Sequence, residues 1–119
     1  MHIIKKYGYT YEEILKDFNG IKLYKFRNDT VKNNTMDLIV SKTIIQLNKI
    51  IKKIKPDLFV IHGDRCETLA AAISCNFNNV LLAHVEGGEV SGTVDESIRH
   101  ACTKFSHIHF VSNSKAKKY

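Results

Sequence analysis

The chain has 119 residues, of which 44% are hydrophobic and 25% are charged, and its formal net charge is +6. These values are close to the averages for soluble globular proteins, so they exclude a disordered or fibrous chain and indicate one domain with a modest core. No apolar run approaches the roughly 20 residues of a membrane helix and no secretory signal opens the chain, so we expect a cytoplasmic protein without a membrane partner.

The first part of the chain predicts a short helix followed by two irregular segments. Thr10 and Glu13 have the spacing of a capping box, which predicts a helix over residues 11–18. Weak alternation predicts a strand or extended segment over residues 21–26, and the polar, turn-rich composition of residues 27–34 predicts a loop.

A long helix is predicted over residues 36–54, because apolar residues recur there at three-to-four spacing, with Thr35 as N-cap and Pro56 beyond the end. Much of the positive charge falls on the polar positions of this segment and just after it, at Lys49, Lys52, Lys53 and Lys55. Lysines spaced in this way indicate a solvated helix face, so we expect no nucleic-acid partner.

The second half of the chain alternates regularly between apolar runs and helical patterns. Strands are predicted over residues 58–61, 80–85 and 108–111, the first of them buried on both sides. Helices are predicted over residues 65–76 and from Thr93 to about residue 105, where Thr93 and Glu96 form a second capping-box pair. A glycine-rich loop over residues 86–93 precedes this second helix, and residues 112–114 turn into the start of another.

This alternation predicts an α/β fold: a Rossmann-like parallel sheet with helices on both faces. In such sheets, ligands bind at the carboxyl ends of the strands. Asp64 and Arg65 directly follow the first of these strands, Glu86 follows the second, and Asp95 and Arg99 lie on the helix after it. The sequence therefore places its polar groups at one edge of the sheet.

The residue types at this edge suit acid/base chemistry on a phosphate-bearing ligand. Asp64, Glu86 and Asp95 are candidates for proton transfer, and Arg65 could clamp a phosphate with its planar guanidinium. Gly87 and Gly88 are candidates for substrate binding, because glycine lets the backbone approach a ligand closely. Arg99 lies four residues after Asp95, so either a salt bridge to Asp95 or a contact with substrate is expected.

Other kinds of site are disfavoured. The three cysteines lack metal-binding spacing and fit a reducing compartment, and neither a dinucleotide-binding nor a P-loop glycine motif follows a strand. Histidines are frequent but have no recognised metal-ligand spacing, so we expect no metal site. These histidines are His62, His84, His100, His107 and His109.

The polar segments read HGDR (residues 62–65), HVEGGEVSGT (84–93) and SIRHA (97–101), with Asp95 between the last two. In these segments the chain resembles the hydrolysing UDP-N-acetylglucosamine 2-epimerases, which begin sialic acid synthesis. Non-hydrolysing sister enzymes usually have threonine at the position of Arg65 and a different loop after Glu86, so both features favour the hydrolysing branch.

The resemblance implies a GT-B-like fold of two Rossmann-like domains with a UDP-sugar between them, a homo-oligomeric full-length protein and no cofactor. It implies conversion of UDP-N-acetylglucosamine and water to N-acetylmannosamine and UDP. The route is loss of UDP across C1–C2 to give a glycal, then hydration with inversion at C2. By family position, Asp64, Glu86 and Asp95 carry the acid/base chemistry and Arg65 contacts the UDP moiety.

Relative to that family, residues 1–119 are expected to be a partial N-terminal domain without its first strand and without the second domain. We expect no turnover from such a chain alone. Two other functions stay open. One is a metal-dependent phosphoesterase, because Gly63-Asp64-x-x-Glu67 distantly resembles a metal motif. The other is a non-catalytic protein that binds a nucleotide-sugar.

Overall fold

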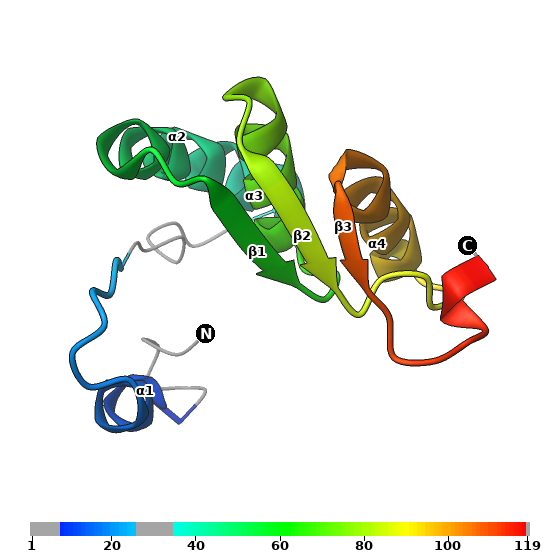
Figure 1. The fold of residues 1–119 in the computed structure, drawn as a ribbon, viewed down its shortest axis with the longest axis horizontal. Helices are drawn as coiled ribbons and strands as arrows, with labels where there is room; N and C mark the ends of the chain where they lie inside the picture. The colour runs from blue at the N-terminus through cyan, green and yellow to red at the C-terminus, as the bar shows by residue number, and fades with distance from the viewer. Residues whose placement is uncertain (1–7, 26–34, 119) are drawn as a thin grey trace.

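The computed structural model describes residues 8–25 and 35–118. Three short strands form a parallel sheet in the order β1 (Leu58–His62), β2 (Leu81–Val85) and β3 (Ile108–Phe110). Helix α3 (Cys66–Phe77) connects β1 to β2, and helix α4 (Val94–Phe105) connects β2 to β3 (Figure 1). The predicted α/β class and parallel sheet are therefore confirmed.

The segments before the sheet agree with the sequence in part. Helix α1 (Tyr11–Asp17) and helix α2 (Met36–Ile54) are present as predicted. The strand or extended segment expected over residues 21–26 is not a strand in residues 21–25. A strand needs a neighbour to take its hydrogen bonds, and these residues join none of the three strands of the sheet. The predicted loop over residues 27–34 lies outside the described residues.

Helix α2 presents one apolar side to the core and its lysines to solvent. Leu47 and Ile51 are buried, one turn apart, whereas Lys49, Lys52 and Lys53 are exposed. The helix ends where Lys55 adopts a left-handed conformation with φ of 51°, and its N–H donates to the Ile51 carbonyl (2.7 Å). The interpretation of the lysines as a solvated helix face is confirmed.

The three helices α2, α3 and α4 form one layer behind the sheet (Figure 1). Helix α3 packs on β1 and β2, α4 packs on β2, and α2 packs on α3. Helix α3 approaches its neighbours closely because Ala70, Ala71 and Ala72, three small residues that point to successive sides of the helix, are almost fully buried between the sheet, α2 and α4. Ile61 and Leu82 from the strands complete a core that also contains Cys75 of α3 and Ile98 and Cys102 of α4.

The prediction of helices on both faces is wrong for the part of the chain that the structure describes. The opposite face of the sheet is exposed, with exposed fractions of 45% for Leu58, 55% for Val60 and 56% for Phe110. Strand β1 is accordingly buried on one side, not on both as expected. An apolar run shows what a strand can bury, but the described helices cover only the face to which Ile61 and Leu82 point.

Within residues 8–25 and 35–118, none of the helices is both long enough and apolar enough to span a bilayer.

Candidate active site

The carboxyl ends of β1 and β2 meet at one edge of the sheet. The register pairs His62 with Val85, and the N–H of Gly63 donates to the Val85 carbonyl (3.0 Å). The N–H of Glu86 donates in turn to a carbonyl of β3 (2.8 Å). Backbone pairing therefore continues one residue past each strand and fixes the segments that carry Asp64 and Glu86.

Asp64 forms an ion pair with Arg99 of α4, and the two side chains are only 27% and 10% exposed. The other terminal nitrogen of Arg99 donates to the backbone carbonyl of Glu89 (2.7 Å). The prediction of a salt bridge between Arg99 and Asp95 is wrong, because Arg99 lies on the buried side of α4 whereas Asp95 is exposed. Arg99 thus joins α4, the glycine-rich loop and the Asp64 carboxylate.

Arg65 is engaged by a carboxylate of the protein itself. Its Nε and Nη2 donate to the two oxygens of Glu67 at 3.1 and 3.2 Å. This hydrogen bonding raises the pKa of Arg65, and the nearby negative charge of Asp95 adds to the shift. Burial opposes ionisation of Glu67, but hydrogen bonds led by that of Arg65 hold its pKa below the ordinary value. A phosphate bound by Arg65 would therefore compete with Glu67.

Glu86 has a backbone conformation that residues other than glycine rarely adopt. Its φ is 64°, in the left-handed region, and such strain costs about 1–3 kcal/mol. Its carboxylate lies 2.9 Å from Nε2 of His62, with both side chains more than half exposed. Tyr9, Lys55 and Asn79 also have positive φ, so this conformation alone does not mark a site, and the catalytic role of Glu86 stays a prediction.

His84 is fully buried beneath the site and contacts two of the segments that form it. Its Nε2 lies 2.8 Å from the Gly63 carbonyl and its Nδ1 lies 3.2 Å from the Thr103 hydroxyl. A carbonyl can only accept, so Nε2 carries the proton and Nδ1 of the neutral ring is an acceptor. The single hydroxyl proton of Thr103 is shared between this nitrogen and the Arg99 carbonyl, which lies 3.0 Å from the Thr103 oxygen. The imidazole therefore connects β2 to the residue before Asp64 and to α4.

We expect His84 to stay neutral across the physiological pH range. Burial lowers its pKa, although the hydrogen bond to Gly63 partly opposes the shift. In the unfolded chain this histidine should titrate near its ordinary value of about 6.5. Below that pH the unfolded state binds a proton that the folded state excludes, so His84 should make the fold less stable as pH falls from about 6.5.

Imidazole ¹⁵N NMR of the 119-residue chain would check this expectation. His84 should show the neutral tautomer protonated at Nε2, with a titration midpoint below the ordinary histidine value of about 6.5. A doubly protonated His84 ring at pH 7, or a proton on Nδ1, would contradict the assignment.

Gly87 and Gly88 are buried against the protein, which gives a structural reason for glycine at both positions. A Cβ on Gly87 would lie 2.8 Å from the Thr103 hydroxyl and 2.9 Å from Nδ1 of His84. Gly88 has a φ of 78°, and a Cβ there would collide with the backbone carbonyl of Ala116. Their contact with substrate stays a prediction.

The loop is closed by Glu96 in a way that the capping-box prediction did not anticipate. Glu96 Oε2 accepts from the backbone N–H groups of Ser91 (2.8 Å) and Gly92 (2.6 Å). These bonds hold the pKa of Glu96 below its ordinary value. Thr93 makes no side-chain capping bond, and neither does Thr10 at α1, so both capping boxes were wrong in detail. The loop bends so that Glu96 meets the two residues before Thr93.

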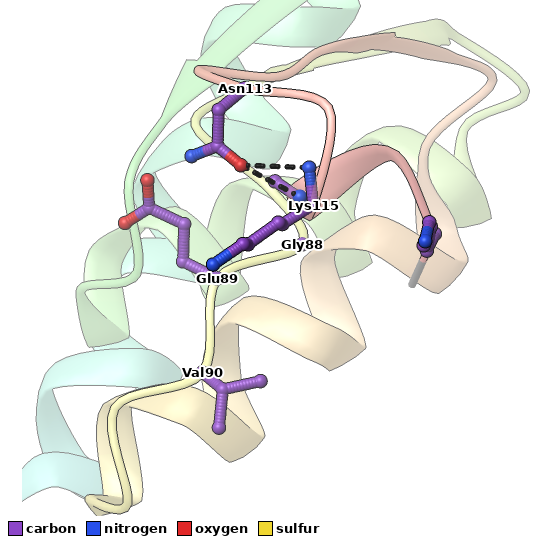
Figure 2. A pocket seen from close by; sticks show the side chains of 7 residues that line it. Gly88, Glu89, Val90, Asn113 and Lys115 are labelled. Carbon is purple, nitrogen blue, oxygen red and sulfur yellow. Dashed lines mark hydrogen bonds between the residues drawn. The ribbon is translucent and has the colours of Figure 1, made fainter.

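A pocket of about 570 Å³ lies between the glycine-rich loop and the segment after β3 (Figure 2). One wall is formed by Gly88, Glu89 and Val90, and the other by residues from Asn113 to Lys118. The Asn113 side-chain oxygen accepts from the N–H groups of Lys115 and Ala116, each at 3.0 Å, and so shapes the turn that enters η2 (Ala116–Lys118). The pocket adjoins the loop held by Arg99, but Asp64, Glu86 and Asp95 do not line it.

Among the described residues, no group of three or more histidine, cysteine, aspartate or glutamate side chains is arranged to hold a metal ion. The two acids of the Gly63-Asp64-x-x-Glu67 segment are each paired with an arginine instead. His107 has a structural contact, because its Nδ1 accepts the N–H of Leu82 at 3.2 Å.

Two contacts at this edge were missed from the sequence, namely the His62–Glu86 pair and the buried His84 bridge. The sequence pattern offers these histidines only as candidate metal ligands. The signal that could have found the first pair is register: His62 ends one strand and Glu86 follows the next, so parallel pairing places them together.

Comparison with known proteins shows which family this chain resembles. The sequence model described as UDP-N-acetylglucosamine 2-epimerase matches residues 1–119. A relative named UDP-N-acetylglucosamine 2-epimerase from Neisseria meningitidis serogroup B is 43% identical over 116 residues, covering 98% of this chain and 30% of that protein. A Legionella pneumophila protein named UDP-N,N'-diacetylbacillosamine 2-epimerase (hydrolyzing) is 35% identical over 119 residues, covering 99% of this chain and 32% of that one.

The fold comparison agrees. The crystal structure of UDP-GlcNAc 2-epimerase from Methanocaldococcus jannaschii, in complex with UDP-GlcNAc and UDP, superposes with a TM-score of 0.75 at 26% identity. The superposition covers 90% of this chain and 30% of that one. The chain thus has the GT-B-like α/β architecture of these enzymes and spans about a third of the length of the relatives it matches. We conclude that the chain belongs to the UDP-N-acetylglucosamine 2-epimerase family.

Proposed function

We propose that this chain supplies the acid/base wall of a hydrolysing UDP-N-acetylglucosamine 2-epimerase, which converts UDP-N-acetylglucosamine and water to N-acetylmannosamine and UDP. The observation that supports the proposal is that Asp64 and Glu86 follow the paired ends of β1 and β2, with Arg99 bound to Asp64 and a left-handed backbone at Glu86. The sequence adds Asp95, at the start of α4, as the third candidate. A hydrolyzing activity is part of the name of the Legionella pneumophila relative.

The reaction needs proton transfer at C2 in both of its steps. In the first, a base removes the C2 proton while the C1–O bond to UDP breaks, giving a glycal. In the second, water adds to C1 and an acid delivers a proton to C2 from the opposite face. Two carboxyl groups on opposite sides of the sugar can exchange these roles. Asp64, Glu86 and Asp95 are the candidates for this work.

The remaining predicted residues serve binding in this proposal. Arg65 would exchange part of its contact with Glu67 for a diphosphate oxygen, because the planar guanidinium suits both anions. Gly87 and Gly88 would contact substrate through their backbone, and Arg99 would act mainly through Asp64.

We further propose a cytoplasmic enzyme that is homo-oligomeric at full length and has no nucleic-acid or membrane partner. The free thiols of Cys66, Cys75 and Cys102, all buried, fit a reducing compartment. Burial raises the pKa of Cys75 and of Cys102 to about 11, which keeps these thiols protonated.

A hybrid enzyme tests the function. In it, this chain replaces the matching segment of the Neisseria meningitidis serogroup B relative, which supplies the rest of the protein. Incubated with UDP-N-acetylglucosamine, the hybrid should release free UDP and N-acetylmannosamine in equal amounts. The parent relative and the isolated 119-residue chain are the controls, and the isolated chain should show no turnover. A hybrid that binds UDP but forms only UDP-N-acetylmannosamine, or forms no product, would overturn the proposal.

A further inference from the structure

His62 is the last residue of β1 and its side chain points away from the helix layer. The preceding residue, Ile61, is buried against the helices, and side chains alternate along a strand. The parallel register sets His62 beside Val85, so its imidazole lies next to the residue that follows, Glu86. The result is the 2.9 Å contact between His62 Nε2 and Glu86 Oε2.

Stability does not explain this contact. The two side chains are 67% and 54% exposed, and ion pairs or hydrogen bonds between such exposed groups add little to folding. The backbone at Glu86 is left-handed and is held by its N–H bond to β3 and by the buried glycine after it. This backbone sets the direction in which the side chain leaves the chain. The contact with His62 restrains the carboxylate at the other end of that side chain.

We propose that His62 is a positioning residue for Glu86: its Nε2–H donates to Oε2 and thereby fixes the plane of the carboxylate. The inference rests on the proposed function, in which Glu86 exchanges a proton at C2 of the sugar. Because a carboxylate is planar, fixing one oxygen also fixes the direction of the other. Proton transfer depends steeply on this alignment, whereas binding of the nucleotide does not depend on it.

Substitutions at position 62 of the hybrid enzyme test the role. Leucine removes the donor, so His62→Leu should lower kcat by about 10- to 100-fold while KM changes by less than about twofold. Glutamine can donate from its side-chain nitrogen, so His62→Gln should recover most of the lost kcat. The matched control is His100→Leu, which removes the imidazole of another histidine–glutamate contact, His100–Glu96 (3.6 Å), and should leave kcat within about twofold.

Two results would overturn the proposal. One is a kcat for His62→Leu equal to that of the unsubstituted hybrid. The other is an equal loss of kcat in His62→Gln and His62→Leu, because His62 would then act through its charge or its own proton and not by orienting Glu86.

A second measurement does not depend on activity and uses the 119-residue chain itself. The ¹³C resonance of the Glu86 carboxylate should shift and broaden in His62→Leu and return toward its original position in His62→Gln. An unchanged Glu86 resonance in His62→Leu would overturn the positioning role. If the unsubstituted hybrid lacks activity but the Glu86 resonance responds as expected, the proposed function fails and the His62–Glu86 contact stands.

Discussion

Replacing Glu86 with glutamine in the hybrid enzyme should lower kcat by about 10²- to 10⁴-fold, the range typical for loss of a general acid or base. Asp64→Asn should have an effect of similar size. Glutamine and asparagine keep the shape of each side chain but cannot exchange a proton. Asparagine at position 64 also removes the charge opposite Arg99, so this variant should be less stable than Glu86→Gln but still folded. Initial rates of UDP release give kcat and KM for each variant, and circular dichroism checks the fold.

The control for these two variants is Glu12→Gln. It makes the same chemical change in α1, far along the chain from the candidate site, and should leave kcat unaltered. Activity close to that of the unsubstituted hybrid in Glu86→Gln or in Asp64→Asn would remove that residue from the acid/base role.

Replacing Arg99 with methionine should destabilise the 119-residue chain by roughly 2–3 kcal/mol. The change leaves the Asp64 carboxylate without its partner, and removing one member of a buried ion pair costs about 3–5 kcal/mol when burial is complete. Asp64 keeps 27% of its exposure, so the loss should be smaller than that range. Urea unfolding at pH 7 measures the difference in the free energy of unfolding.

Arg65→Met is the matched control, because Arg65 also pairs with a carboxylate but is 54% exposed. It should cost less than about 1 kcal/mol, as exposed ion pairs usually do. The double variant Asp64→Asn/Arg99→Met should be more stable than Arg99→Met alone, since it no longer leaves a partly buried charge unpaired. Equal losses for Arg65→Met and Arg99→Met would contradict the structural role assigned to Arg99.

The helices and strands after residue 35 could be predicted because the spacing of their apolar residues agrees with the positions of the residues that end helices and strands. Helix α2 has the predicted bounds, and the apolar runs mark all three strands within about one residue. The positions of Asp64 and Glu86 at one edge also followed from the sequence, since parallel strands bring their carboxyl ends together. These features depend on local pattern and on one topological rule.

The contacts that orient the site could not be predicted in the same way. The sequence offered Asp95 as the partner of Arg99, because residues four apart share a helix face. The actual partner, Asp64, depends on which side of α4 faces the sheet, and that is decided by packing of Ile98 and Cys102 in the core. Likewise, Glu96 caps the loop through Ser91 and Gly92 because the bend of that loop is set by tertiary contacts.

The burial of the sheet was also misjudged from composition. The run Leu58–His62 contains enough apolar residues for burial on both sides, yet Leu58 and Val60 are exposed in the described structure. The composition of a strand shows which of its faces could be buried. Whether a face is buried depends on which other segments pack against it.

The most direct test of the central claim is to run the hybrid reaction in D₂O and locate deuterium in the product by NMR. If the carboxylates of this chain transfer protons at C2, the original C2 proton leaves to a base and its replacement comes from solvent. The N-acetylmannosamine formed should then carry one deuterium at C2, and the signal should disappear together with UDP release in Glu86→Gln. Product that retains its C2 proton, or UDP release accompanied by N-acetylglucosamine, would contradict proton transfer at C2 by this edge of the sheet.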